Sequence, residues 1–211
     1  MQRVALIDYG SGNLRSAEKA LVRAAGGSAD IVVTNDPDVV ATADRIVLPG
    51  VGAFAACMSA LSARAGVIEA MNSAVQGRGA PFLGICVGMQ LMAARGLEFG
   101  TTSGLGWIDG DVKIIEPVGE GLKVPHMGWN TLDVTSEIPM LKGPKAGEPV
   151  YFTHSFAMFP RDGADVAAYV DHGGRFPAAV ARGNLAGVQF HPEKSQAAGL
   201  KLLASFLEWR P

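Results

Sequence analysis

One short segment, Pro81–Gln90, constrains the fold more than any other part of the chain, because it places a cysteine between a strand and a helix. The apolar residues before the cysteine predict a buried strand, and the residues from Val87 onward predict a helix. Cys86 therefore lies at a strand-to-helix turn, which is the geometry of a nucleophile elbow with sulfur in place of oxygen. Glycines at 84 and 88 fit this turn, since its strained central residue leaves little room for side chains beside it.

The same alternation of strands and helices fills the first half of the chain. The expected strands are Arg3–Asp8, Asp30–Val33, Arg45–Leu48 and Pro81–Ile85, and the expected helices are Asn13–Ala25, Ala53–Ala63, Val67–Gln76 and one that begins at Val87. Such βα units predict an α/β fold with a central, mostly parallel sheet and flanking helices.

Strand patterns dominate the second half, with few helices between them. The expected strands are Asp111–Glu116, Thr131–Thr135, Val150–Thr153, Val166–Asp171, Ala178–Ala181 and Leu185–Phe190, followed by a helix over Ser195–Trp209. We expect these strands to form a mixed or antiparallel extension of the sheet. With 211 residues and no recognisable linker or repeat, residues 1–211 are expected to form a single domain.

Composition excludes several classes of function. The net charge of −2 argues against binding to nucleic acid, which needs many basic groups. No long apolar stretch predicts a membrane span, and the acidic Asp8 comes too early for a signal peptide, so we expect a cytoplasmic protein. Cys57 and Cys86 lie in different contexts and are expected to stay unpaired. The histidines and cysteines lack metal-ligand spacing, so we predict neither a metal nor another cofactor.

Cys86 can be interpreted in two ways. The helix that begins at Val87 would direct its positive end and its first N–H groups at the sulfur, which favours the reactive thiolate. The N–H of Val87 could also bind an oxyanion formed during attack. Alternatively, Cys86 is a small buried apolar residue, the usual state of a free cysteine. The elbow alone does not decide between these readings.

A second motif, Gly187–Glu193, supports the catalytic reading of Cys86. Its apolar strand leads to His191 and, two positions later, to Glu193. Residues two apart in an extended segment project to the same side, and Pro192 favours extended angles at His191, so the carboxylate can orient the imidazole. Together the three side chains predict a Cys86–His191–Glu193 triad, which a chance His-Pro-Glu surface turn would not explain.

The Gly-rich loop Leu48–Ala53 is a third candidate element. It follows a parallel strand, so it is expected to face the same crevice as Cys86, where the N–H groups of Gly50, Val51 and Gly52 could bind the oxyanion. An ordinary tight strand-to-helix turn is the alternative interpretation.

These motifs resemble the class I, or triad, glutamine amidotransferases. The elbow and the His-Pro-Glu segment resemble the whole class. A narrower resemblance, to the glutaminase subunits of imidazole glycerol phosphate synthases, rests on segments spread along the chain: Asp8–Leu14, Leu48–Phe54, Pro125–Asn130 and Tyr151–Phe156. The resemblance implies that Cys86 attacks the carboxamide of L-glutamine, that His191 moves the proton and that Glu193 orients His191.

The resemblance also implies the residues that surround the triad. An oxyanion hole would come from Val87 and from the loop of Gly50, Val51 and Gly52, with the peptide at Val51 turning inward before it donates. The expected glutamine-binding residues are Gln90, Glu98, Thr153, His154, Ser155 and Phe156, the last standing where this family commonly has Tyr. A carboxylate such as Glu98 suits the α-ammonium of glutamine, although a solvated helix end would also explain it.

A protein partner is implied as well. It is a (β/α)₈-barrel cyclase that forms a heterodimer with the glutaminase and receives its ammonia in histidine biosynthesis. Gly10, Ser11, Gly12, Asn13 and Lys194 are the expected partner-facing residues, although a solvated lysine would equally explain Lys194. Two alternatives stay open at this point: a glutaminase of pyridoxal phosphate or anthranilate synthesis, and a catalytically silent regulatory subunit.

Overall fold

The computed structural model describes residues 1–142 and 147–211, and an eight-stranded sheet forms its centre. In spatial order its strands are β2 (Ala29–Thr34), β1 (Gln2–Ile7), β3 (Arg45–Gly50), β4 (Phe82–Cys86), β14 (Leu185–Val188), β13 (Arg175–Arg182), β12 (Val166–Asp171) and β9 (Asp133–Val134). The first five strands run parallel to one another, and each of the last three runs antiparallel to its neighbours. The prediction of an α/β fold with an antiparallel extension is thus confirmed.

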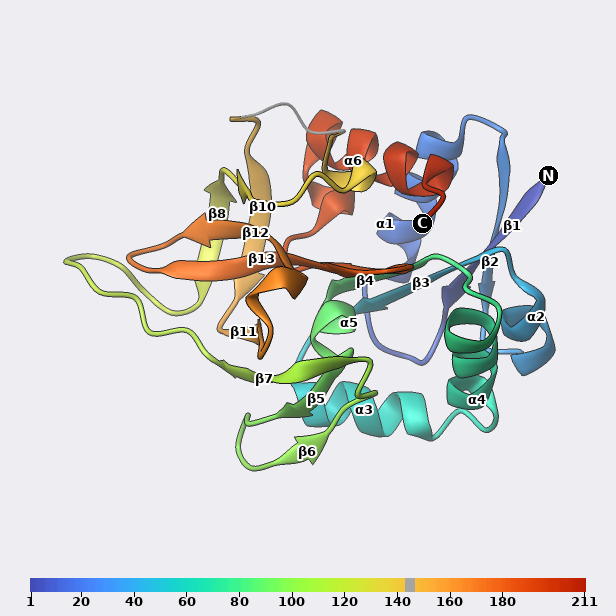
Figure 1. The fold of residues 1–211 in the computed structure, drawn as a ribbon, viewed down its shortest axis with the longest axis horizontal. Helices are drawn as coiled ribbons and strands as arrows, with labels where there is room; N and C mark the ends of the chain where they lie inside the picture. The colour runs from blue at the N-terminus through green and yellow to red at the C-terminus, as the bar shows by residue number, and fades with distance from the viewer. Residues whose placement is uncertain (143–146) are drawn as a thin grey trace.

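Helices cover both faces of the parallel half. They are α1 (Leu14–Ala25), α2 (Pro37–Thr42), α3 (Phe54–Ser62), α4 (Val67–Asn72), α5 (Val87–Gln90) and α6 (Gln196–Glu208). In Figure 1, α1 and α6 lie above the sheet, whereas α3 and α5 lie below it. Because apolar layers cover both faces, every residue of β3 and of β4 is buried, as expected for central parallel strands.

Two smaller sheets lie beside the central one. One contains β11 (Phe156–Pro160), β7 (Ile108–Ile114), β5 (Ala93–Gly96) and β6 (Thr102–Ser103), and the other pairs β10 (Val150–His154) with β8 (His126–Asn130). Short 3₁₀ helices occur at Pro139–Lys142, Gly163–Asp165 and Pro192–Lys194. The second half of the chain therefore adds β14, β13, β12 and β9 to the central sheet and places its other strands in the two smaller sheets.

The elements with strong apolar periodicity match the predictions to within a few residues, but four departures are clear. The helix expected over Val67–Gln76 ends at Asn72 and continues as a π-helical turn over Ser73–Gly77. The strand expected over Thr131–Thr135 is reduced to β9. Helix α2 was not predicted, although Asp36 caps it and Pro37 begins it in the usual manner. Strands β5, β6, β8 and β11 were not predicted either.

The predicted helix after Cys86 begins at Val87, as expected, and is short. It ends at Gln90, and the chain then turns into β5. Leu91 O accepts a hydrogen bond from Leu105 N at 2.8 Å, and Ala93 O accepts one from Gly106 N at 3.0 Å, so the backbone here bonds to a neighbouring loop instead of continuing the helix. Within the described ranges, no single helix is long and apolar enough to cross a membrane, although α3 and the segment Val67–Gly77 pass that test as a pair bent by 95°.

Candidate active site

A cleft of about 620 Å³ opens where the central parallel strands end. Strand β3 leads into its Val51–Gly52 edge, β4 delivers Cys86, and His191 follows β14. The cleft is lined by Asn13, Val51, Gly52, Cys86, Val87, Gln90, Glu98, Phe99, Pro125, Thr153, His154, Ser155, Phe156, His191 and Lys194. A crevice at the carboxyl ends of parallel strands is the usual ligand site of an open α/β sheet.

Cys86 occupies a strained backbone conformation at the base of this cleft. Its φ of 54° and ψ of −112° are unusual for a residue with a side chain, and such strain costs on the order of 1–3 kcal/mol. The neighbouring glycines make the turn possible. A Cβ at Gly88 would lie 1.8 Å from Leu48 O, and a Cβ at Gly84 would lie 2.6 Å from Gly88 O. The nucleophile-elbow geometry expected for Cys86 is therefore present in this structure.

His191 and Glu193 form a buried pair beside the elbow. His191 Nδ1 lies 2.7 Å from Glu193 Oε1, and the side chains are only 2% and 4% exposed. The backbone differs from the expected extended segment, because Glu193 lies in the 3₁₀ helix Pro192–Lys194. Only His191 is extended, with φ −103° and ψ 97°. The carboxylate thus reaches Nδ1 of the imidazole through a helical turn.

The electrostatic surroundings favour a protonated His191. Burial lowers its pKa, but the sulfur of Cys86 and the carboxylate of Glu193 raise it more, and the resulting pKa is about 9. Within the described part of the chain, the remaining atoms Nε2 of His191 and Oε2 of Glu193 are buried without a hydrogen-bond partner. An imidazolium between a sulfur and a carboxylate can both stabilise a thiolate and donate a proton to a leaving group.

The predicted oxyanion-hole residues surround the elbow. Val87 follows Cys86 directly, and Gly50 is the register partner of Cys86 in the β3–β4 pairing. A Cβ at Gly50 would lie 2.8 Å from Gly88 N, so only glycine fits there. The carbonyl oxygen of Val51 accepts a hydrogen bond from Ser11 Oγ at 2.8 Å. Val51 and Gly52 line the cleft, whereas Gly50 is buried behind it.

All six residues predicted to bind glutamine line the same cleft: Gln90, Glu98, Thr153, His154, Ser155 and Phe156. Glu98 follows strand β5, not a helix end as expected. Its Oε2 accepts a hydrogen bond of 2.7 Å from Phe54 N at the start of α3. The backbone oxygen of Phe156 accepts a hydrogen bond from Gln90 Nε2 at 2.9 Å. These contacts fix the walls of the cleft, and the binding roles themselves stay predictions.

Gln189 belongs to the site although it was not predicted. Its side chain is fully buried, and its Nε2 donates to Cys86 Sγ at 3.6 Å. The available signal was a polar residue within the apolar strand pattern that precedes His191. Its position beside Cys86 depends on the pairing of β14 with β4, which a single sequence does not reveal.

Two buried histidines contact each other here: His154, which lines the cleft, and His126 next to it. His126 Nδ1 is 3.1 Å from His154 Nε2, and His154 Nδ1 is 3.0 Å from Phe156 O. Burial is the main cause that lowers the pKa of each ring to about 4, so both rings are neutral at pH 7. A carbonyl only accepts, so the Nδ1 of neutral His154 carries the proton and its Nε2 accepts from His126. His126 Nε2 then accepts from Asn130 Nδ2, at 3.4 Å.

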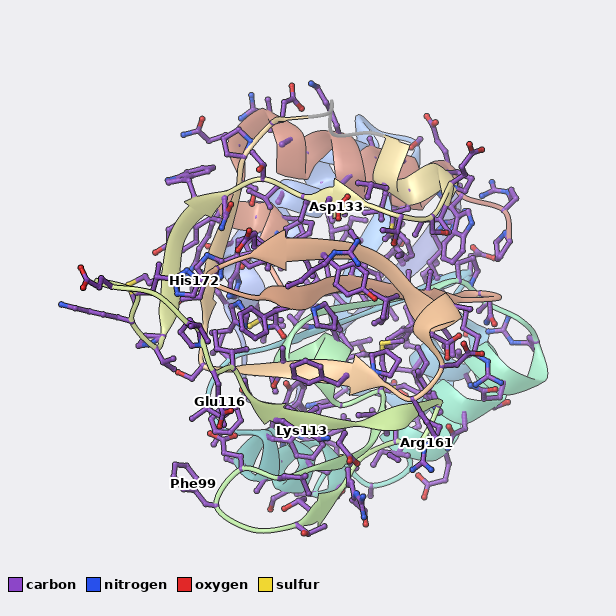
Figure 2. All side chains as sticks on the ribbon, turned by 60° about the vertical axis from the view of Figure 1, so that its left-hand side comes forward. Phe99, Lys113, Glu116, Asp133, Arg161 and His172 are labelled. Atoms are coloured by element: carbon purple, nitrogen blue, oxygen red, sulfur yellow. The ribbon has the colours of Figure 1, made fainter. Side chains whose placement is uncertain are left out.

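The predicted partner-facing residues divide into two groups. Asn13 and Lys194 line the cleft, whereas Gly10, Ser11 and Gly12 do not. Phe99, which lines the cleft, is 96% exposed and projects into solvent from its loop in Figure 2. Other exposed large apolar side chains include Val118, Leu122, Val124, Met127 and Trp129.

A strained cysteine at an elbow, facing a buried histidine–carboxylate pair, is the arrangement of a cysteine-dependent amide hydrolase. A family model described as "Glutamine amidotransferase class-I" matches residues 5–209. The chain belongs to the class I glutamine amidotransferase family.

Curated relatives assign the chain to a narrower group within this class. The chain is 63% identical to "Imidazole glycerol phosphate synthase subunit HisH" of Caulobacter vibrioides, with 100% of both chains covered. Proteins of the same name from Rhodospirillum rubrum and Brucella suis biovar 1 are 56% and 54% identical to this chain. Each of these alignments covers 99% of this chain and 100% of the relative. Within the class, the chain therefore falls in the HisH group.

Solved structures agree on the fold. "Structure of PurLQS from Thermotoga maritima" has a TM-score of 0.71 at 23% identity, with 98% of each chain covered. "Crystal structure of glutamine amidotransferase" has a TM-score of 0.68 at 18% identity, with 97% of each chain covered. At these identities the likeness concerns the fold alone.

Proposed function

We propose that this chain is the glutaminase subunit of imidazole glycerol phosphate synthase and hydrolyses L-glutamine to glutamate and ammonia. The observation that carries the proposal is the buried His191–Glu193 pair beside the strained Cys86, in a chain whose full-length relatives bear the name of that subunit. The same names weigh against the pyridoxal phosphate and anthranilate alternatives. The intact set of three side chains weighs against a silent subunit.

In the first half of the reaction, Cys86 Sγ bonds to the side-chain carbonyl carbon of glutamine. The oxyanion accepts hydrogen bonds from the N–H of Val87 and from the loop of Gly50, Val51 and Gly52. His191, protonated because its pKa is about 9, gives its Nε2 proton to the amide nitrogen. The C–N bond then breaks, ammonia leaves, and a glutamyl thioester remains on Cys86.

In the second half, the neutral His191 accepts a proton from water as the water attacks the thioester carbon. The C–S bond breaks, glutamate leaves, and the thiolate–imidazolium pair is restored. Glu193 holds Nδ1 at 2.7 Å throughout, so Nε2 stays directed at the reacting atoms and the positive charge on the ring is stabilised. Every proton taken up by His191 is returned in the same cycle.

The partner in this proposal is a (β/α)₈-barrel cyclase that forms a heterodimer with this chain. The side chain of Phe99, which lines the cleft and is 96% exposed, supports a protein-covered surface there. In the cyclase, ammonia would convert an aminoimidazole-carboxamide ribonucleotide with an opened phosphoribulosyl sugar. The products are imidazole glycerol phosphate and aminoimidazole carboxamide ribotide.

Glutamate release tests the proposal. The assay compares this chain alone, with the cyclase, and with the cyclase plus its nucleotide ligand, each beside a Cys86→Ser variant. We expect low activity alone, a large rise in the loaded complex and none with the variant. Activity that depends on Cys86 but ignores the cyclase would reassign the pathway. If no mixture releases glutamate, the chain is a silent subunit.

A further inference from the structure

Gln189 is a buried polar residue beside the sulfur of Cys86, and the mechanism above gives it no role. Strands β4 and β14 pair in parallel with Ile85 opposite Val188, and continuing this register places Gln189 beside Cys86. Its side-chain nitrogen lies 3.6 Å from Cys86 Sγ. No part of Gln189 is exposed to solvent, so its amide must be satisfied by protein groups.

The hydrogen bonds around Gln189 fix which end of its amide faces the sulfur. Phe156 O can only accept, so the group of Gln90 that lies 2.9 Å from it is the NH₂ nitrogen. That same nitrogen lies 3.0 Å from Gln189 Oε1 and donates its second proton to it. With its oxygen occupied in this way, Gln189 presents its NH₂ group to Cys86. Reversing either amide would oppose two donors or two acceptors.

We propose that Gln189 is a positioning residue for Cys86, and that Gln90 acts through it by holding its amide in the donating orientation. An N–H group directed at sulfur binds the thiolate more strongly than the thiol, so it favours the reactive form. It also restrains the sulfur in the cleft, where the strained backbone alone would leave the side chain free to rotate. This inference rests on the proposed function, because positioning matters here for attack on glutamine.

The placement of Gln90 gives it a second role beside the predicted contact with glutamine. Both protons of its NH₂ group are used within the protein, on Phe156 O and on Gln189 Oε1. Only its own carbonyl oxygen stays available for a ligand in the cleft that Gln90 lines. The residue thereby links the wall of the cleft to the nucleophile.

Two substitutions at Gln189 separate positioning from packing. Gln189→Met keeps the length of the side chain but removes the donor, and Gln189→Glu keeps the shape but places an acceptor against the sulfur. A matched structural control is Asn184→Ala, at the start of the same strand. Asn184 Nδ2 donates to Val75 O and Ala80 O, both at 2.8 Å, so its loss weakens the packing of β14 without touching Cys86.

The measurement is the pH dependence of the rate at which iodoacetamide alkylates Cys86 in the full-length chain, followed on its own peptide by mass spectrometry. Gln189→Met should move the midpoint of the profile to higher pH by about one unit, because a hydrogen bond to a charged group is worth about tenfold or more in equilibrium. Gln189→Glu should move it further. In the complex with the cyclase, kcat for glutamate release should fall about tenfold or more, with a smaller change in KM.

Unchanged midpoints in both Gln189 variants would overturn the proposal, as would an equal shift in Asn184→Ala. Gln90→Met provides a second variant, which should shift the midpoint in the same direction by less, and it decides the matter if the Gln189 variants do not fold. If the wild type never releases glutamate but the Gln189→Met variant still shifts the alkylation midpoint, the proposed function is refuted and the positioning role stands. If the wild type releases glutamate but the midpoint of the Gln189→Met variant is unchanged, the positioning role is refuted and the proposed function stands.

Discussion

Acidification should destabilise this protein through the buried pair His126 and His154. Each ring has a folded-state pKa of about 4, below its ordinary value of 6.5. Between these values the unfolded chain binds more protons than the folded chain, so stability is complete above pH 6.5 and is lost as the pH falls toward 4. At about 1.4 kcal/mol per pKa unit, one ring would contribute up to about 3.5 kcal/mol.

The window from pH 6.0 to 4.5 isolates this contribution. Over it each ring accounts for about 1.7 kcal/mol, and the two rings together account for about 3.4 kcal/mol. The titration of His191 adds little to the stability change in this window. Its raised pKa keeps it protonated in the folded chain, and below pH 6 it is mostly protonated in the unfolded chain as well. A loss of this size is a large part of the 5–15 kcal/mol that typically stabilises a domain.

Urea unfolding at closely spaced pH values measures the effect, with fluorescence of the buried Trp209 as one signal. The wild type is compared with a His126→Gln, His154→Gln double variant, in which carboxylates titrate as before. The double variant should be less stable at pH 7.5 and should lose about 3.4 kcal/mol less than the wild type between pH 6.0 and 4.5. Parallel curves for the two proteins would refute the assignment of low pKa values to these rings.

Three further outcomes are expected. Glu193→Gln should lower kcat for glutamate release by about 10²–10⁴-fold with little change in KM, because His191 loses its orienting carboxylate; steady-state kinetics in the cyclase complex would show it. Gly88→Ala should destabilise the fold by more than about 3 kcal/mol in urea, since its Cβ would lie 1.8 Å from Leu48 O; near-wild-type stability would contradict the tight elbow. Stability should also fall as the pH rises from 6.5 through about 9, because His191 has a raised pKa, and Cys86→Ser should reduce this loss in the same urea titration.

Local sequence patterns, such as apolar periodicity and the positions of glycines, were enough to predict most of the parallel half of the sheet and the turn at Cys86. Cys86 between two glycines, after an apolar strand, has few structural solutions, and the steric contacts of Gly84 and Gly88 show why. The prediction of a triad rested on chemistry that requires complementary side chains, wherever they lie in the chain, and its catalytic role stays a prediction. The backbone of Glu193 was predicted wrongly, because the step after Pro192 suits a 3₁₀ turn as well as an extended segment.

Other features depend on tertiary context and left no local signal. Strand β5 follows the short elbow helix without a Gly or Pro boundary, and its pairing with β7 overrides its weak intrinsic preference. The hydrogen bond from Gln189 to Cys86 joins residues 103 positions apart. The pairing of His126 with His154 likewise depends on β8 lying against β10. Register between distant strands cannot be derived from the periodicity of one sequence.

The insertion of β14 between β4 and β13 also sets an order of events during synthesis. After residue 86 has left the ribosome, β4 is an apolar edge strand with one unpaired side, and about a hundred more residues must follow before β14 can cover it. Such an edge is prone to pair with other chains, so the growing polypeptide is most vulnerable to aggregation in this interval. Because His191 and Glu193 arrive with β14, a nascent chain cannot release ammonia before its sheet is closed.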